Sequence, residues 1–130
     1  MKVASQRLMQ DWHHTRLWQT GLELVTEIYT ITRMFPPEER YAMTSQLRRA
    51  ATSILANFAE GFCRISPADK QHKYIIARGE CAEVCAFLDM AISVNLTTQQ
   101  QTSRAKSLVD GVGKMLSGFV YSTEALNRSA

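Results

Sequence analysis

Residues 44–61 repeat their apolar side chains at the spacing of an α-helix, and this limits the folds open to the chain. The stretch reads TSQLRRAATSILANFAEG, with apolar residues at Leu47, Ala51, Ile54 and Phe58. Steps of four, three and four are the helical period and not the alternation of a strand. Thr44 is predicted to cap the start of this helix. Gly61 is predicted to end it in the left-handed conformation.

Three other segments show the same period. A first helix is predicted from about residue 15 to residue 34, and Pro36-Pro37 stops it because proline cannot donate a backbone hydrogen bond. The run Ser66-Pro67-Ala68-Asp69 has the cap, first-turn proline and acidic residue of a helix start, so a third helix is expected to run to about Ser93. A last helix begins after Thr97 or Thr98, and its predicted apolar seam contains Ala105, Leu108, Val112, Met115, Phe119 and Leu126.

Four amphipathic helices joined by short links predict an all-α fold, an antiparallel up-down-up-down four-helix bundle. Residues 15–127 are expected to form this single domain, and residues 1–14 a flexible N-terminal arm. Gly111, Gly113 and Gly118 lie within the last helix, where each costs about 1 kcal/mol relative to alanine. Such glycines indicate that another backbone approaches closely.

The composition is that of a reduced, non-membrane protein of one domain. The chain has 130 residues, a formal net charge of +3 and three cysteines. An odd number of cysteines fits free thiols better than a disulfide framework. The N-terminus has no apolar core of a signal peptide, and no stretch approaches the roughly 20 apolar residues that span a bilayer. We therefore expect a cytoplasmic protein.

No motif indicates a metal, a cofactor or catalysis. Cys81 and Cys85 lie one turn apart, but no second pair at matching spacing completes a zinc site. The sequence contains no phosphate-binding glycine loop and no nucleophile elbow. We expect no metal, no cofactor and no catalytic residues, and hence a protein that is not an enzyme.

One bacterial family shares a dense group of positions with this chain. They are Phe35-Pro36, Glu39, Tyr41, the run from Gln46 to Ala51, Ser53-Ile54, Asn57 and the run from Ala59 to Gly61. On these residues the chain resembles the four-helix-bundle proteins encoded in intervening sequences of large-subunit ribosomal RNA genes. Their relatives are similar to the accessory variability determinant of diversity-generating retroelements. The resemblance runs from about Leu17 to about Tyr121 and becomes loose after Ala91.

The resemblance implies an oligomeric protein that contacts RNA or DNA, or an enzyme of nucleic acids such as a reverse transcriptase. The cations expected to make this contact are Arg48, Arg49, Arg64, Lys70, Lys73 and Arg78. Glu80 departs from the serine usual in the family, and we expect it to pair with Arg48 or Arg49. The residues alone leave open whether this surface binds a polyanion or is a solvated face with internal ion pairs.

The resemblance also implies a homo-oligomer, by analogy a ring-shaped pentamer that closes by rotation. A set of large apolar residues is the expected subunit interface, namely Trp18, Leu22, Val25, Tyr29, Phe62 and Tyr121. The alternative for these side chains is that they thicken the subunit's own core. The alternative function is that of a purely structural homo-oligomeric scaffold without a nucleic-acid role.

Overall fold

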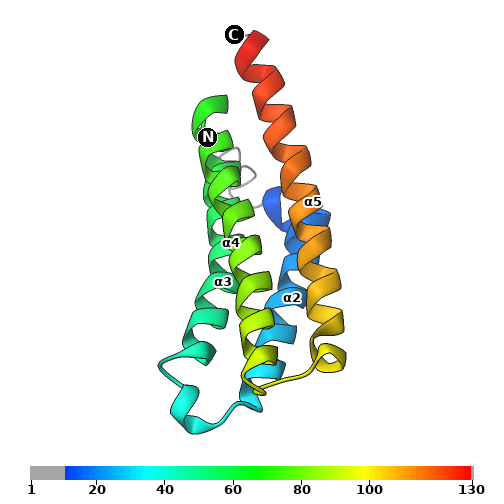
Figure 1. Cartoon of the computed structure of the whole chain (residues 1–130). Helices are drawn as coiled ribbons and strands as arrows, with labels where there is room; N and C mark the ends of the chain where they lie inside the picture. Colours follow the sequence, from blue (N-terminus) through cyan, green and yellow to red (C-terminus); the bar gives the residue numbers. More distant parts are fainter. Residues whose placement is uncertain (1–10, 130) are drawn as a thin grey trace.

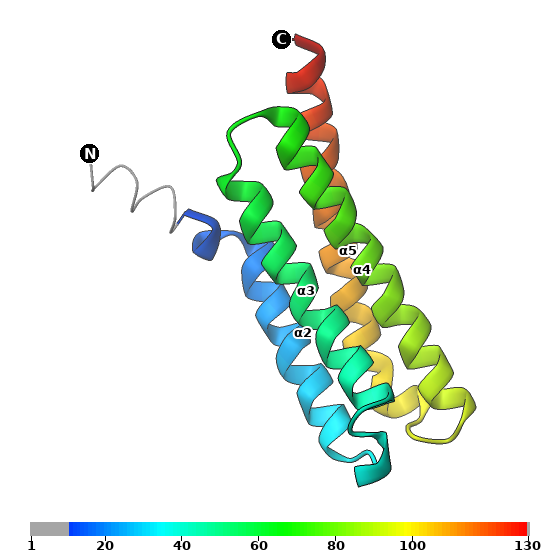
Figure 2. The ribbon, with the colours of Figure 1, turned by 90° about the vertical axis from the view of Figure 1, so that its left-hand side faces the viewer.

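The computed structural model describes residues 11–129, and within them every regular element is a helix. Figure 1 shows the long helices running alternately up and down, and Figure 2 shows the same bundle from the side. The predicted all-α antiparallel bundle is therefore confirmed. Its elements are a 3-10 turn η1 (Asp11–His14), α2 (Arg16–Arg33), a 3-10 turn η2 (Pro37–Glu39), α3 (Met43–Cys63), α4 (Pro67–Ser93) and α5 (Gln99–Ser129).

The helices form a closed ring of neighbours in which α2 packs on α3, α3 on α4, α4 on α5 and α5 on α2. The α2–α3 and α4–α5 connections lie at one end of the bundle, and the α3–α4 link lies at the other (Figure 1). The apolar stripes meet in a single core that includes Leu24, Phe58, Tyr74 and Val84, all fully buried. Most of the predicted arm, residues 1–10, lies outside the described residues.

Of the three predicted side-chain caps at helix starts, two are confirmed and one is wrong. The Ser66 hydroxyl accepts from the Asp69 backbone N–H and caps α4. The Thr98 hydroxyl accepts from the Gln101 N–H in the first turn of α5. Helix α3, however, begins at Met43, after Ala42 and without a side-chain cap, so Thr44 lies inside the helix.

Gly61 does not end α3 in a left-handed conformation, which corrects the prediction. The residue lies inside the helix, and no described glycine has a positive φ. A Cβ at this position would lie 2.8 Å from the Tyr74 ring and 2.9 Å from the Lys73 Cβ. Gly61 is therefore needed because α4 crosses α3 here at close range.

The buried stripe of α5 is rotated from the predicted seam. Ala105 and Val112 are buried as expected, but the other buried residues of α5 are Thr102, Val109, Leu116, Val120 and Thr123. Leu108, Met115 and Phe119 pack at the edge of the core, and Leu126 is exposed. The α5 glycines meet no close neighbour in the subunit, so the close approach expected for them does not occur within the bundle.

Candidate nucleic-acid interface

Arg48 faces α2. Its Nε donates to the Thr32 hydroxyl at 2.9 Å, and its guanidinium carbon lies 4.2 Å from the centre of the Tyr29 ring. Both partners are neutral, so Arg48 keeps its full charge while its orientation is fixed. A guanidinium held over an aromatic ring remains able to bind an anion with its outer nitrogens.

Arg49, the next residue, faces α4 instead. Its Nη2 lies 3.0 Å from Glu83 Oε1 and its Nη1 3.8 Å from Glu80 Oε2. The predicted ion pair between Glu80 and one of the two arginines is thereby confirmed, with Arg49 as the partner. The Arg49 side chain is 49% exposed and the Glu80 side chain 14%. Burial raises the pKa of the Glu80 carboxyl, and the neighbouring Glu83 carboxylate raises it further.

Arg64, Lys70 and Lys73 gather at the opposite end of the bundle, as expected. Lys73 Nζ lies 2.8 Å from Glu60 Oε2, and Arg64 Nη2 lies 3.9 Å from the same oxygen. The hydrogen bond and charge of Lys73 lower the pKa of Glu60, with a smaller effect of Arg64 in the same direction. Glu60 faces both cations, but its single negative charge offsets only one of them.

Lys70 closes the end of α3 rather than facing solvent. Its Nζ donates to the backbone oxygens of Phe62 at 2.6 Å and Gly61 at 3.4 Å. A cation at the C-terminus of a helix satisfies carbonyls that have no partner within the helix. Burial lowers the pKa of Lys70. Its contacts are those of a structural residue.

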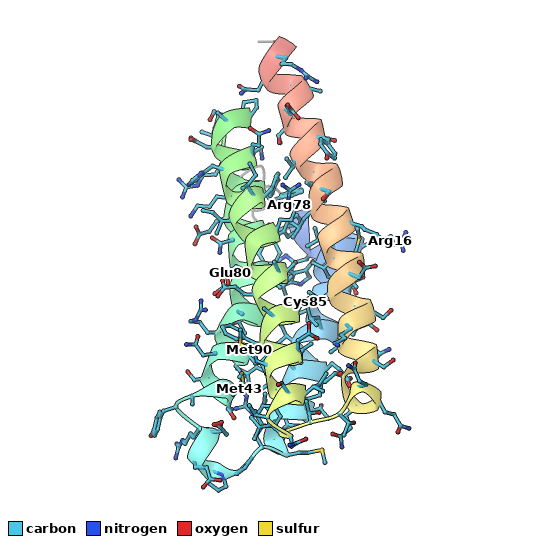
Figure 3. All side chains as sticks on the ribbon, viewed as in Figure 1. Arg16, Met43, Arg78, Glu80, Cys85 and Met90 are labelled. Atoms are coloured by element: carbon cyan, nitrogen blue, oxygen red, sulfur yellow. The ribbon has the colours of Figure 1, made fainter. Side chains whose placement is uncertain are left out.

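Arg78 faces α5, where its Nη1 lies 3.5 Å from the Ser117 hydroxyl. Figure 3 places Glu80 on the α3 side of α4 and Arg78 on the side toward α5. The structure thus does not bring the six predicted cations together. They divide among the α2–α3 groove, the α3–α4 groove, the α3–α4 link and the α4–α5 groove. Successive residues of a helix point about 100° apart, so adjacent arginines diverge.

The sequence interpretation missed two arginines at the end of the bundle where α2 connects to α3. Arg33 ends α2, and Arg40 lies in the connection to α3, with its guanidinium 5.4 Å from the centre of the exposed Tyr41 ring. Within residues 11–129, no carboxylate forms an ion pair with Arg33, Arg40 or Arg48. We call Arg33, Arg40, Arg48 and Arg49 the arginine end of the bundle. Arg33 and Arg40 flank Pro36-Pro37, which the sequence predicts to be a connection between helices. This position was the signal in the sequence that could have identified them.

The family model described as 23S rRNA-intervening sequence protein matches residues 13–118. The chain belongs to this family. The matched region contains the whole bundle core up to Leu116 and all four residues of the arginine end.

A solved relative supports the fold of this family member. It is a crystal structure of a protein with unknown function from the S23 ribosomal protein family of Bacteroides thetaiotaomicron. The two chains are 26% identical, the TM-score is 0.73, and the match covers 80% of this chain and 97% of the other. No curated protein matches the sequence.

The residues expected at a subunit interface have different environments in this family member. Trp18, Val25 and Phe62 are partly buried and pack against the subunit's own core. Trp18 meets Trp12 edge to face at 4.3 Å, and the Phe62 ring lies 5.8 Å from Phe58. The ring of Tyr29 carries Arg48, as described above. Two of the set are largely open to solvent, Leu22 at 45% and Tyr121 at 64% exposed.

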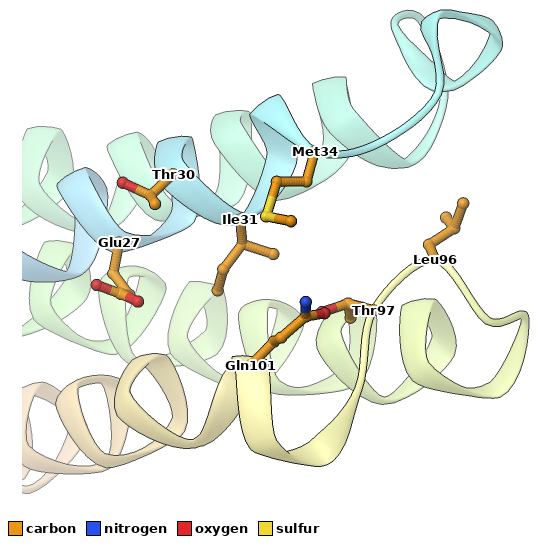
Figure 4. Close-up of a pocket in the computed structure, with 7 residues that line it drawn as sticks. All are labelled: Glu27, Thr30, Ile31, Met34, Leu96, Thr97 and Gln101. Carbon is orange, nitrogen blue, oxygen red and sulfur yellow. The ribbon is translucent and has the colours of Figure 1, made fainter.

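A small pocket of about 120 Å³ lies between the end of α2 and the α4–α5 connection (Figure 4). Two of its polar groups are already paired, since Arg104 lies 3.5 Å from Glu27 and the Thr97 hydroxyl donates to the Gln101 side-chain oxygen. Burial raises the pKa of Cys81 to about 12, which keeps this thiol protonated.

No helix among residues 11–129 is long and apolar enough to cross a membrane.

Proposed function

We propose that this member of the 23S rRNA-intervening sequence protein family is a non-enzymatic, oligomeric four-helix bundle that binds the phosphate backbone of RNA or DNA. The contact is made by the arginine end. The observation that carries the proposal is that Arg33 in the last turn of α2, Arg40 in the α2–α3 connection and Arg48 in the second turn of α3 have no ion-pair partner among the described residues. A net charge of +3 and the tie of the family to ribosomal RNA genes support a polyanionic partner.

The chemistry of these side chains suits phosphate. A guanidinium offers a planar fork that bonds two phosphate oxygens at once. Arg48 is already oriented by Tyr29 and Thr32, so little side-chain freedom is lost when it binds. Glu38 and Glu39 lie in the same connection and temper the local charge, but they form no ion pair with these arginines. Contacts of this kind read the backbone and not the bases.

The test is a salt titration with a charge-reversal pair. Binding of a fluorescently labelled RNA duplex is followed by anisotropy between about 50 and 200 mM salt, a range over which phosphate contacts weaken steeply. Arg33→Glu with Arg40→Glu is expected to weaken binding strongly and to reduce the slope of log K against log salt by about 2. Neither residue packs in the core, so the fold should be unchanged.

The matched control reverses two cations at a distance from the arginine end. Lys114→Glu with Arg128→Glu changes the net charge equally on exposed positions of α5. It should leave the salt slope close to that of the parent protein. Equal losses in both pairs, or no binding at the lowest salt, would contradict the proposal.

The second candidate is a structural homo-oligomer without nucleic-acid binding. It is favoured by Leu22 and Tyr121, large apolar side chains that the subunit leaves in solvent. Light scattering on a sizing column measures the mass of the assembly. An oligomer that shows no RNA or DNA binding at low salt would establish this second function in place of the first.

A further inference from the structure

Arg49 lies against two carboxylates at once. Glu83 and Glu80 are one helical turn apart on α4, and Arg49 is the only cation paired with either of them within residues 11–129. Its Nη2 also lies 3.5 Å from the Gln46 side-chain oxygen. Removing this one guanidinium would leave two adjacent negative charges without compensation.

The two carboxylates differ in their access to water. The Glu83 side chain is 42% exposed, so solvent can stabilise its charge. The Glu80 side chain is 14% exposed, and its Oε2 is buried without a hydrogen-bond partner. Because its charge is poorly solvated, Glu80 is the carboxyl of the two that takes up a proton more readily.

The charged groups that face Glu80 are few. Arg49 comes from α3, and Glu83 comes from α4 itself together with the Cys81 thiol, which burial keeps protonated. Among the described residues, no ion pair reaches Glu80 from α2 or α5. The protonation of Glu80 is therefore set by burial, by Glu83 and by the position of Arg49. Burial and Glu83 favour the proton, and Arg49 opposes it.

We infer that Arg49 is a proton-linked phosphate contact: when a phosphate takes its guanidinium, Glu80 binds one proton from solvent and donates a hydrogen bond to Glu83. This inference rests on the proposed binding of a nucleic-acid backbone. The Arg49 guanidinium exchanges its pairing with Glu80 for a pairing with the phosphate. The proton then removes the negative charge of Glu80, which would otherwise repel that of Glu83. Binding at this contact then tightens as the pH falls.

The Glu60 site provides an internal contrast. Glu60 also faces two cations, Arg64 and Lys73, but its side chain is 54% exposed and it has no second carboxylate beside it. Losing a cation there leaves a single, hydrated charge, which needs no proton. Proton linkage is thus expected at Glu80 and not at Glu60.

The experiment measures RNA affinity as a function of pH. The full chain is titrated with a labelled RNA duplex between about pH 5.5 and 7.5 at constant ionic strength. Uptake of one proton gives at most a tenfold change in affinity per pH unit. Glu80→Gln should bind RNA at least as tightly as the parent protein at the upper pH and lose most of this dependence. The matched control Glu60→Gln should keep it.

A second measurement counts protons directly. Calorimetry of the same titration in two buffers of different ionisation enthalpy gives the protons taken up on binding, expected to be lower in Glu80→Gln than in the parent protein. Arg49→Gln should show the same loss of proton uptake together with weaker binding. Equal pH dependence and equal proton uptake in parent and Glu80→Gln would overturn the inference while leaving the proposed function standing. Absence of RNA binding at every pH would overturn both.

Discussion

At the scale of single residues, folding places the Glu80 carboxylate in a largely buried position, which is unfavourable for its negative charge. Its carboxylate is mostly buried and, among the described residues, shares its one ion-pair partner, Arg49, with Glu83. Since burial raises the pKa of Glu80 in the folded state, the protonated form is favoured by folding. The contribution of Glu80 to stability is therefore present at low pH and is lost as the pH rises through the raised pKa.

Replacing Glu80 by glutamine should consequently stabilise the protein at neutral pH. The amide can donate to Glu83 as the protonated acid would, and the buried charge is gone. We expect a gain of about 1 kcal/mol at pH 7.5 that shrinks toward pH 4.5. Urea unfolding at the two pH values measures it. The exposed Glu23→Gln serves as the control, and a Glu80→Gln gain that is equal at both pH values would contradict this account.

At the scale of elements, the side-chain caps predicted for the starts of α3 and α4 can be compared directly. Ser66 caps α4 through its hydroxyl, whereas Thr44 caps nothing. Ser66→Ala should cost about 1 kcal/mol of unfolding free energy, and Thr44→Ala should change it by no more than about 0.5 kcal/mol. Chemical denaturation of the two variants decides the point. Comparable losses of unfolding free energy in both variants would show that Thr44 does cap the start of α3.

The glycines of α3 and α5 should respond in opposite directions. Gly61→Ala places a methyl group within 3 Å of Tyr74 and Lys73, so we expect a loss of about 1–3 kcal/mol. Gly113→Ala meets open space in the subunit and should gain about 1 kcal/mol from helix propensity. Thermal unfolding of both variants at low protein concentration tests this pair. Destabilisation by Gly113→Ala would mean that α5 is covered by another chain.

The sequence predicts elements better than it predicts which way their side chains point. The helix from Pro67 to Ser93 is found as expected, because cap, proline and period agree. In α5, two neighbouring apolar rows compete, and the buried row includes Thr102 and Thr123, which look polar in the sequence. Their hydroxyls donate to the carbonyls of Thr98 and Phe119 one turn earlier, so burial leaves them satisfied.

The candidate site shows the same limit. The Arg49–Glu80 pair could be anticipated because antiparallel packing of α3 on α4 sets their register. That Arg48 turns to α2 while Arg49 turns to α4 could not be read without knowing how α3 is rotated in the bundle. The basic residues of the sequence give the number of positive charges available. Only the packing of the helices decides which of these charges lack a carboxylate as an ion-pair partner.

At the scale of the whole molecule, the bundle leaves several large apolar side chains exposed, Leu22 and Tyr121 among them. Leu22 on α2 is 45% exposed and Tyr121 on α5 is 64% exposed, and these two helices pack against each other. A monomer gains nothing from keeping them in water, because each buried large side chain contributes roughly 1.5–3 kcal/mol. A subunit interface that includes both is the arrangement expected from the proposed oligomer.

Leu22→Asp with Tyr121→Asp should therefore dissociate the assembly without unfolding the subunit. Both positions are exposed in the isolated bundle, so the new carboxylates remain hydrated in the monomer. In an interface they would be buried without a partner, at a cost of several kcal/mol for each charge. Light scattering reports the mass, and circular dichroism reports the helices. Ile65→Asp is the control, since Ile65 is 97% exposed in the α3–α4 link and belongs to no expected interface. An unchanged mass in the double variant would place the subunit contacts elsewhere, and the open surface of α5 at Gly113 and Gly118 would be the next to test.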